Sequence, residues 1–214
     1  MKKLIILLTG FFLLSTGAAW GTPWPITYEL TGLLSGDYNG VSFTGSIFNL
    51  QLTANAMDVT PVTTFDPSSP NDLYVVGVHP YHAGPSLNGS LSLKDLGVFT
   101  FLNNLYVSDS QQNNLQPGIL EIGTDVEAAF IDISDPFFTT YKMMTKVNPL
   151  TISGSQAGYS SFAVAEAGGA VGELTLADAT SLTFQAEGGV PEPSTFMLLG
   201  AGLFGLIFTR RKRS

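Results

Sequence analysis

The chain alternates apolar and polar side chains from Ile26 onwards, and clusters of glycine, asparagine, aspartate, serine and proline interrupt the alternation. In the stretch ITYELTGLL, Ile26, Tyr28 and Leu30 occupy every second position, with threonine or glutamate between them. A period of two places one set of side chains on each face of a strand, whereas an amphipathic helix repeats every 3.6 residues. The pattern therefore predicts short strands joined by turns, with little helix.

Strands are expected wherever the alternation continues between two turn clusters. The strongest turn signal is Asn39-Gly40, a dipeptide that favours a two-residue hairpin between alternating segments. The window 166–180 is rich in alanine and compatible with one turn of helix, although its glycines weaken that interpretation. The expected strands cover residues 26–34, 41–56, 73–78, 90–93, 98–107, 119–122, 126–133, 149–152, 159–165, 171–176 and 181–186.

Many short strands separated by turns are typical of antiparallel β-sandwiches and jelly rolls. We therefore predict an all-β fold, an antiparallel β-sandwich or jelly-roll-like ectodomain, in one domain over residues 22–188. A segment of this length can bury roughly 70% of the surface of its unfolded chain, so its core can hold without disulfides. The chain has no cysteine, which excludes disulfides, thiolate zinc sites and cysteine nucleophiles.

The predicted domain is strongly acidic. Between residues 22 and 189 the chain has sixteen acidic residues against three lysines, Lys94, Lys142 and Lys146, which gives a formal charge of −13. Such a surface as a whole repels the phosphates of nucleic acids and anionic lipid headgroups, so we expect no nucleic acid among the partners.

The first 21 residues have the three parts of a secretory signal peptide: two lysines, an apolar stretch over 4–14, and small residues. Cleavage after Ala19 or after Gly21 would satisfy the small-residue rule of signal peptidase. An uncleaved anchor is the alternative, but the apolar stretch is short for a membrane span. We expect export through the secretion translocon and removal of residues 1–21 by signal peptidase.

A second apolar run, residues 195–208, lies near the C-terminus. As a helix it measures about 21 Å, against roughly 30 Å for a bilayer core. A thinner bilayer, or basic side chains that extend to the headgroups, can make up the difference. By the positive-inside rule we predict a short transmembrane helix, with the tail 209–214 in the cytoplasm and the domain outside. A buried core helix with a solvated tail is the alternative. The tail's cations are Arg210, Arg211, Lys212 and Arg213.

The segment around this run resembles a known sorting domain. The resemblance is carried by the stretch Val190, Pro191, Glu192, Pro193, Ser194, by Gly200, Gly202 and Gly205 in the run, and by the arginine-rich end. Residues 189–214 are in these features similar to the PEP-CTERM sorting domain of exported bacterial proteins. The resemblance implies that an exosortase, a membrane transpeptidase-like enzyme, recognises Pro191, Glu192 and Pro193. It also implies a transient anchor in the inner membrane, held until the chain is processed near these residues.

The residues of the motif agree with an exposed processing segment. Pro191 and Pro193 oppose helix formation and strand pairing, and they hold the chain extended. Glu192 lies between them, just outside the expected membrane span. An enzyme can reach such a segment easily.

Two segments contain residue types that bind metals. His79 and His82 are the only histidines, and they form a metal site only if a third ligand such as Asp72 folds nearby. Asp66 and Asp72 offer oxygen ligands for calcium, but Pro70 falls where a ligand is needed and no bidentate glutamate follows. We expect a solvated loop around His79 and His82, a plain turn at Asp66 and Asp72, and no cofactor. Calcium bound at Asp66 and Asp72 is the alternative.

Acidic pairs are the other candidates for chemistry. Glu121 with Asp125, and Asp132 with Asp135, could serve as the two carboxylates of a glycosidase if their separation in space allowed it. Asp125, Glu127 and Asp135 flank an apolar strand, as acids on a solvated rim do. The sequence has no nucleophile elbow, phosphate loop or zinc motif, so we predict that the protein is not an enzyme.

Aromatic side chains are plentiful, and most fall at strand periodicity, where a place in the core is expected. Tyr38, Tyr81 and Tyr106 are instead expected at the surface, where aromatic rings could stack on sugars. The aromatics expected in the core are Phe43, Phe48, Phe99, Phe101, Phe130, Phe137, Phe138, Tyr141, Phe162 and Phe184.

These observations predict a non-enzymatic cell-surface or extracellular-matrix protein. We expect it to be anchored in the inner membrane with its ectodomain outside, and then sorted by an exosortase. The resemblance to the PEP-CTERM domain, which is frequent in exopolysaccharide-producing bacteria, implies an association with exopolysaccharide or biofilm. The alternative is a carbohydrate- or calcium-binding adhesin that its C-terminal helix retains at the membrane.

Overall fold

The computed structural model describes residues 24–62, 72–77, 83–111, 118–125, 129–152, 155–157 and 160–188. In these ranges the chain forms antiparallel strands and two short 3-10 helices, which confirms the predicted all-β, antiparallel fold class. The predicted signal peptide and the segment 189–214 lie outside the described residues. The elements are β1 (Pro25–Tyr38), β2 (Val41–Asn55), η1 (Ala56–Asp58), β3 (Thr60–Val62), β4 (Asp72–Gly77), β5 (Asn88–Leu93), β6 (Gly97–Phe101), β7 (Leu105–Gln111), β8 (Gly118–Thr124), β9 (Ala129–Asp135), η2 (Pro136–Thr139), β10 (Val147–Thr151), β11 (Ser155–Ala157), β12 (Ser160–Glu166) and β13 (Val171–Gly188).

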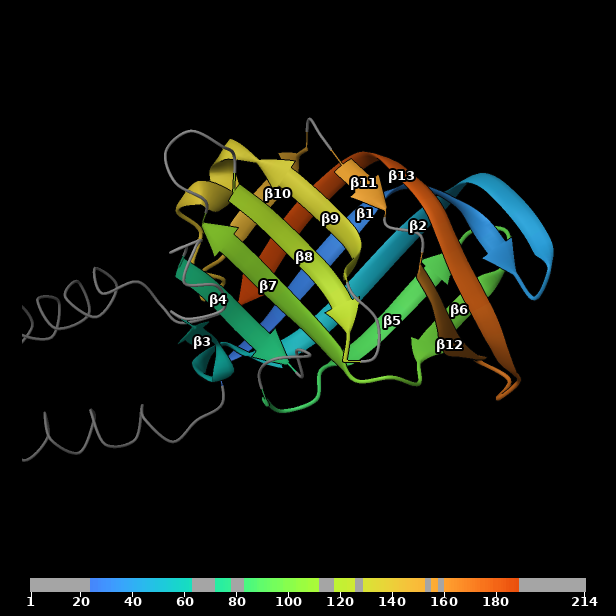
Figure 1. The fold of residues 1–214 in the computed structure, drawn as a ribbon, viewed down its shortest axis with the longest axis horizontal. Helices are drawn as coiled ribbons and strands as arrows, with labels where there is room; N and C mark the ends of the chain where they lie inside the picture. The colour runs from blue at the N-terminus through green and yellow to red at the C-terminus, as the bar shows by residue number, and fades with distance from the viewer. Residues whose placement is uncertain are drawn as a thin grey trace, which may run out of the picture.

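The strands form two sheets that lie face to face over part of their area (Figure 1). The first sheet has seven strands in the order β1-β2-β5-β6-β12-β13-β10, and the second has six in the order β11-β9-β8-β7-β4-β3. Inward side chains of both sheets belong to one hydrophobic core, so the sheets stabilise each other. Core members include Leu30, Leu50, Phe99, Leu174 and Phe184 from the first sheet, and Val76, Val107, Leu120, Ile122 and Ile133 from the second.

The first sheet also returns on itself, because β1 pairs with β13 as well as with β2. The β1–β13 pairing runs from Ile26 opposite Gly188 to Tyr38 opposite Leu174, which is nearly the whole of β1. Strands β1, β2, β5, β6, β12 and β13 therefore form a ring of neighbours, at the end of the molecule where β5, β6 and β12 lie in Figure 1. A closed ring leaves no free strand edge among its members, a feature that the sandwich prediction did not include.

The prediction of two strands at 171–176 and 181–186, with a possible turn of helix within 166–180, is wrong. Val171–Gly188 is one strand of 18 residues. Its first part pairs with β12 and its last part pairs with β10, while β1 runs along its other side. The length of β13 is therefore what joins the ring to the sandwich.

Two β-bulges explain why the sequence of β13 looked broken. The register with β1 shifts twice, once beside Ala177 and once beside Ser181, which has a positive φ of 54°. Each extra residue moves the inward positions by one, so Leu176 is followed by Ala179 and then by Leu182 on the buried face. The period of two is lost at each bulge, although the strand continues.

The segment 98–107, expected as one strand, is also divided. Strand β6 ends at Phe101 in the first sheet, and β7 begins at Leu105 in the second sheet. Asn104 stabilises the bend between them, because its side chain donates a hydrogen bond to Asp125 Oδ2 (2.8 Å) and accepts one from the Ser86 hydroxyl (3.0 Å). The other expected strands agree with the observed ones to within a few residues, while β3 and β11 were not predicted.

The predicted hairpin at Asn39-Gly40 is confirmed. Both residues have positive φ, 52° and 82°, as a two-residue type I′ turn requires. The Gly40 amide donates a hydrogen bond to Asp37 Oδ1 at 2.6 Å. This turn joins the two longest neighbours in the first half of the chain, β1 and β2.

Candidate functional site

Several predicted sites lie outside the described residues. Asp72 is the first residue of β4, with its backbone opposite Gln111, and its side chain is among the parts not described. Among the residues that the structure describes, no group of three or more His, Cys, Asp or Glu could hold a metal ion. The predicted residues outside the described ranges are Asp66, His79, Tyr81, His82, Glu127, the motif Val190, Pro191, Glu192, Pro193, Ser194, and the tail Arg210, Arg211, Lys212, Arg213.

The described chain ends immediately before the predicted sorting segment. Gly188, the last residue of β13, lies opposite Ile26, and one residue separates it from Val190. Gly188 has a φ of 88°, and a Cβ at this position would lie 2.2 Å from the carbonyl oxygen of Pro25. Glycine is therefore required where the sheet ends, and the sorting segment follows within two residues.

Residues 189–213 match the family model of the PEP-CTERM protein-sorting motif. The chain carries a PEP-CTERM sorting motif. The motif supports an exported protein that an exosortase sorts, as the sequence predicted. No curated protein and no solved structure matches the chain.

The PEP-CTERM motif includes the apolar run 195–208, which lies outside the described residues. Within the described ranges, no helix is long and apolar enough to cross a membrane. The transmembrane helix therefore stays a prediction from the sequence.

The first sheet presents a broad polar surface on the side away from the core. Its inward residues are large and apolar, whereas most outward residues between them carry hydroxyl, amide or carboxylate groups. Leu33, Ile47 and Val98 are exposed apolar exceptions at the border of this surface. We call this surface the polar face. It consists of Thr27, Glu29 and Thr31 of β1, Asn49, Gln51 and Thr53 of β2, Ser90 and Ser92 of β5, and Thr183, Gln185 and Glu187 of β13.

The register arranges the polar face in rows that cross the strands. One row runs from Gln185 through Glu29 and Gln51 to Ser90. The next row runs from Thr183 through Thr31, Asn49 and Ser92 in the same way. Neighbouring strands are about 4.8 Å apart, so each row offers hydrogen-bonding groups at a regular spacing.

Glu29 is the one acid in the middle of the polar face, and its charge is held by two amides. Asn49 Nδ2 donates a hydrogen bond to Oε1 of Glu29, and Gln185 Nε2 donates one to Oε2. Each carboxylate oxygen thus has a partner from a neighbouring strand. The arrangement fixes the orientation of both amides across three strands.

The second sheet carries a pair of carboxylates on its outer side. Glu121 of β8 lies directly opposite Asp132 of β9, and Ser108 of β7 donates a hydrogen bond to Glu121 Oε2 at 3.1 Å. Burial raises the pKa of Glu121, although the Ser108 hydrogen bond opposes this shift. Burial, and then the charge of Glu121, raises the pKa of Asp132 to about 6. The two acids therefore share an environment that disfavours two negative charges.

This pairing differs from the pairs that the sequence suggested. The Asp125 carboxylate accepts a hydrogen bond from Asn104 and so stabilises a loop. Asp135 accepts a hydrogen bond from the Phe137 amide (2.9 Å) at the start of η2 and is 9% exposed, so its assignment to a solvated rim is wrong. Partners across a hairpin whose turn is uncertain cannot be read from sequence, and the Glu121–Asp132 pair was missed for this reason.

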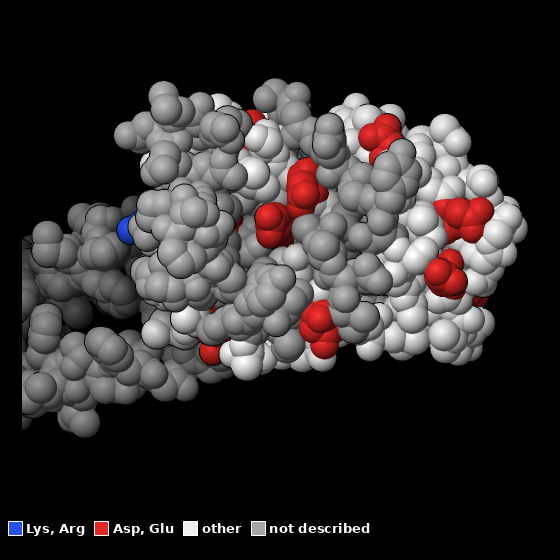
Figure 2. All heavy atoms as spheres, viewed as in Figure 1, with Lys and Arg blue, Asp and Glu red and all other residues white. Residues whose placement is uncertain are grey.

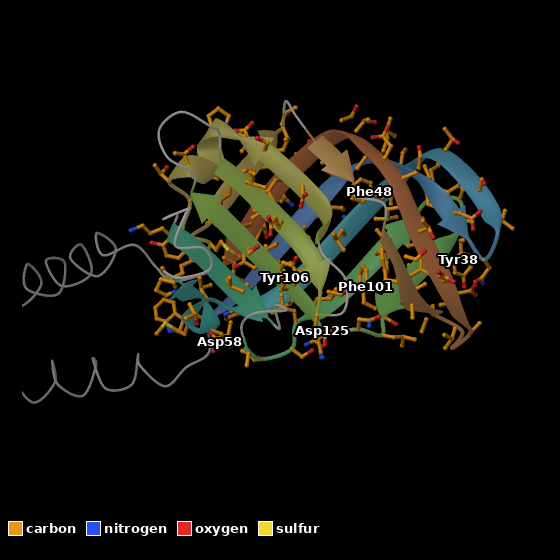
Figure 3. The ribbon with its side chains drawn as sticks, viewed as in Figure 1. Tyr38, Phe48, Asp58, Phe101, Tyr106 and Asp125 are labelled. Atoms are coloured by element: carbon orange, nitrogen blue, oxygen red, sulfur yellow. The ribbon has the colours of Figure 1, made fainter. Side chains whose placement is uncertain are left out.

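The aromatic predictions are correct for most of the described core, wrong at Tyr106 and Phe137, and only partly met at Tyr38. Tyr106, expected at the surface, is 2% exposed, and its ring covers Gly123, where a Cβ would lie 2.5 Å from the tyrosine hydroxyl. Tyr38 is partly buried and packs against Phe99, with ring centroids 4.9 Å apart. Phe137, expected inside, is 37% exposed. Figure 3 labels Tyr38 near one end of the domain and Tyr106 nearer its middle.

Proposed function

We propose that this protein is a non-enzymatic cell-surface or extracellular-matrix protein that an exosortase sorts and that associates with exopolysaccharide. The PEP-CTERM motif over residues 189–213 carries the proposal, because it supports export and processing by a membrane enzyme. The secretion translocon and signal peptidase would act first on residues 1–21. The exosortase would act afterwards at Pro191, Glu192 and Pro193, while the run 195–208 holds the chain in the inner membrane.

The polar face supports the association with exopolysaccharide. Hydroxyl and amide groups both donate and accept hydrogen bonds, and so do sugar hydroxyls. Each group on the polar face can therefore bind a sugar hydroxyl either as donor or as acceptor. Gln51 and Thr53 are exposed on this face, and their cross-strand partners Glu29, Thr27, Ser90 and Asn88 are polar. The polar face has no lysine or arginine, which favours a neutral polysaccharide over an anionic one.

The carboxylates favour a structural role over catalysis. Glu29 is held by two amides, Asp125 by Asn104, and Asp135 caps η2. Glu121 accepts a hydrogen bond from Ser108 and lies opposite Asp132. The ring of Tyr106 fills the space over Gly123, two residues further along the same strand. Glu29, Asp125 and Asp135 thus stabilise the fold through hydrogen bonds that a reaction would disturb.

A second candidate, favoured by the same polar face, is a carbohydrate-binding adhesin that stays at the membrane. It differs from the first in the fate of the tail, because an adhesin of this kind would keep the run 195–208. Both candidates need a surface that hydrogen-bonds to sugars, so the two are separated by processing and not by binding. Calcium at Asp66 and Asp72 belongs to this second candidate.

The sorting part is tested by fractionating host cells with and without their exosortase. We expect the chain at the surface or in the medium of normal cells, and in the inner membrane of cells that lack the enzyme. The same distribution in both strains would contradict sorting by the exosortase.

The polysaccharide part is tested by co-sedimentation of the mature chain with exopolysaccharide purified from the host. We expect Gln51→Ala with Thr53→Ala to lower the bound fraction several-fold. Ser134→Ala with Thr140→Ala, which changes the other sheet and the loop after η2, is the matched control and should leave binding unchanged. Equal binding by both double variants would rule out the polar face.

A further inference from the structure

Both ends of the described chain leave the domain at one place. Strand β1 begins beside the end of β2, with Pro25 opposite Asn55, and beside the end of β13, with Ile26 opposite Gly188. Two hydrogen bonds hold the first residue here: the Trp24 amide donates to Asn55 Oδ1 (3.1 Å), and the Ala56 amide donates to the Trp24 carbonyl (2.8 Å). We call this part of the domain the exit end.

The loop between β9 and β10 lies at the same end. Val147 lies opposite Ala186, two residues before Gly188. The ring of Phe138 is 5.4 Å from that of Phe184, measured between centroids. Figure 3 marks the exit end with Asp58 of η1 and the opposite end with Tyr38.

The exit end exposes apolar side chains together with two of the three lysines of the domain. Met57 in η1 is 54% exposed and Phe137 in η2 is 37% exposed. Lys142 and Lys146 are exposed on the loop that follows η2. In Figure 2 the blue of a basic side chain appears at this end, and red carboxylates are spread over the visible face, including near this end.

Acids are present at the exit end but do not dominate it. Asp58 is partly buried in η1, Asp135 caps η2, and Glu187 is exposed near the end of β13. At the opposite end, Asp37, Glu166 and Glu173 surround the β1–β2 hairpin and the turn before β13. The exit end is therefore less negative than the opposite end of this acidic domain.

The length of chain after Gly188 limits how the domain can face a membrane. Six residues, 189–194, separate Gly188 from the apolar run. Even fully extended, the chain from Gly188 to Thr195 covers at most about 25 Å. If residues 195–208 span the bilayer, as the proposed function holds, the exit end is the part of the domain closest to the headgroups.

We propose that the exit end contacts anionic lipid headgroups while the chain is anchored. Lys142 and Lys146 would meet the phosphates, because exposed lysines are attracted to an anionic surface within a Debye length of about 8 Å. Met57 and Phe137 would enter the boundary between headgroups and acyl chains. This inference rests on the proposed function, since it requires the anchor at 195–208. Its consequence is that Val190–Ser194 is held at the membrane surface, where a membrane enzyme works.

Tryptophan fluorescence of the chain in vesicles tests this proposal. The chain used begins at Thr22, the product expected after signal peptidase, so Trp24 at the exit end is the one tryptophan left as the reporter. The vesicles contain phosphatidylcholine alone or with one third phosphatidylglycerol, and carry brominated acyl chains as quenchers. We expect stronger quenching of Trp24 in the anionic vesicles.

Two lysine variants show whether the contact depends on charge. Lys142→Ala with Lys146→Ala should remove most of the difference between the two vesicle types, and Lys94→Ala, on the turn between β5 and β6, should leave it unchanged. Equal quenching in both vesicle types, with the chain still floating with the vesicles, overturns this inference alone. A chain that does not float with either vesicle overturns the membrane anchor and this inference with it.

Discussion

Glu121 and Asp132 lie directly opposite each other on β8 and β9, on the outer side of the second sheet. Like charges in this position destabilise a sheet, and burial adds to the effect. Oδ1 of Asp132 is buried and accepts no hydrogen bond from the residues that the structure describes, so none of them replaces the water that this atom has lost. The pair therefore costs stability at neutral pH.

Asp132→Asn should stabilise the protein at neutral pH. The pKa of Asp132 is raised to about 6 in the folded protein from 3.8, so the folded state binds more protons than the unfolded state between these values. The wild-type carboxylate thus costs free energy above pH 6 and nothing below pH 4. Because this side chain is partly exposed, we expect a gain of only about 1 kcal/mol at pH 7.5, fading by pH 4.

Urea unfolding of both proteins between pH 4 and 8 measures this difference. Glu121→Gln serves as the partner in a double-mutant cycle, and Asp132→Asn should gain less in that background because the opposing charge is gone. A variant less stable than the wild type at pH 7.5 would show that the carboxylate has a stabilising partner.

Tyr28→Phe should destabilise the domain by about 1–3 kcal/mol, because a buried carbonyl would lose its hydrogen-bond donor. The Tyr28 hydroxyl is buried and donates to the Met143 carbonyl at 2.6 Å, which holds a loop where Met143 has a φ of 61°. Tyr38→Phe is the matched control, since its hydroxyl bonds to Glu166 Oε1 in a partly exposed place. We expect a clearly smaller loss of stability for the control in chemical denaturation. Equal losses would mean that the Tyr28 hydrogen bond does not hold the loop.

Gly188→Ala should weaken the last backbone pairings between β1 and β13. The backbone would have to shift, because Gly188 has a φ of 88° and the added Cβ would lie 2.2 Å from the Pro25 carbonyl oxygen. We expect a loss of about 1–3 kcal/mol in the free energy of unfolding, with faster hydrogen exchange at the Ile26 amide. Gly168→Ala is the control, because a Cβ there meets nothing within 4 Å. If both variants behave like the wild type, the end of β13 is not fixed by Gly188.

The sequence was sufficient for local features and insufficient for pairing across the fold. Alternation found most strands, and Asn39-Gly40 identified its hairpin, because side-chain period and turn chemistry are local. The bulges beside Ala177 and Ser181 were missed, since a bulge is set by the partner strand and appears in the sequence as a break. The pairing of β1 with β13 joins residues 136 to 162 positions apart, and nothing local encodes it.

The candidate sites show the same difference between local features and features that depend on pairing across the fold. The sorting motif is a contiguous segment, so sequence alone identified it, and the family match confirms it. The polar face joins four strands from distant parts of the chain, so only the register reveals that Gln185, Glu29 and Gln51 form one row. The burial of Tyr106 depends on the glycine beside it, which no property of Tyr106 indicates.

The central claim is that the PEP-CTERM motif is processed, and intact-mass spectrometry of the mature protein from its native host tests it most directly. The comparison is with a variant carrying Pro191→Ala, Glu192→Ala and Pro193→Ala. We predict that the wild-type chain ends near residue 193 and that the variant retains the tail to Ser214. A wild-type chain that also ends at Ser214 would contradict processing and leave a permanently anchored surface protein.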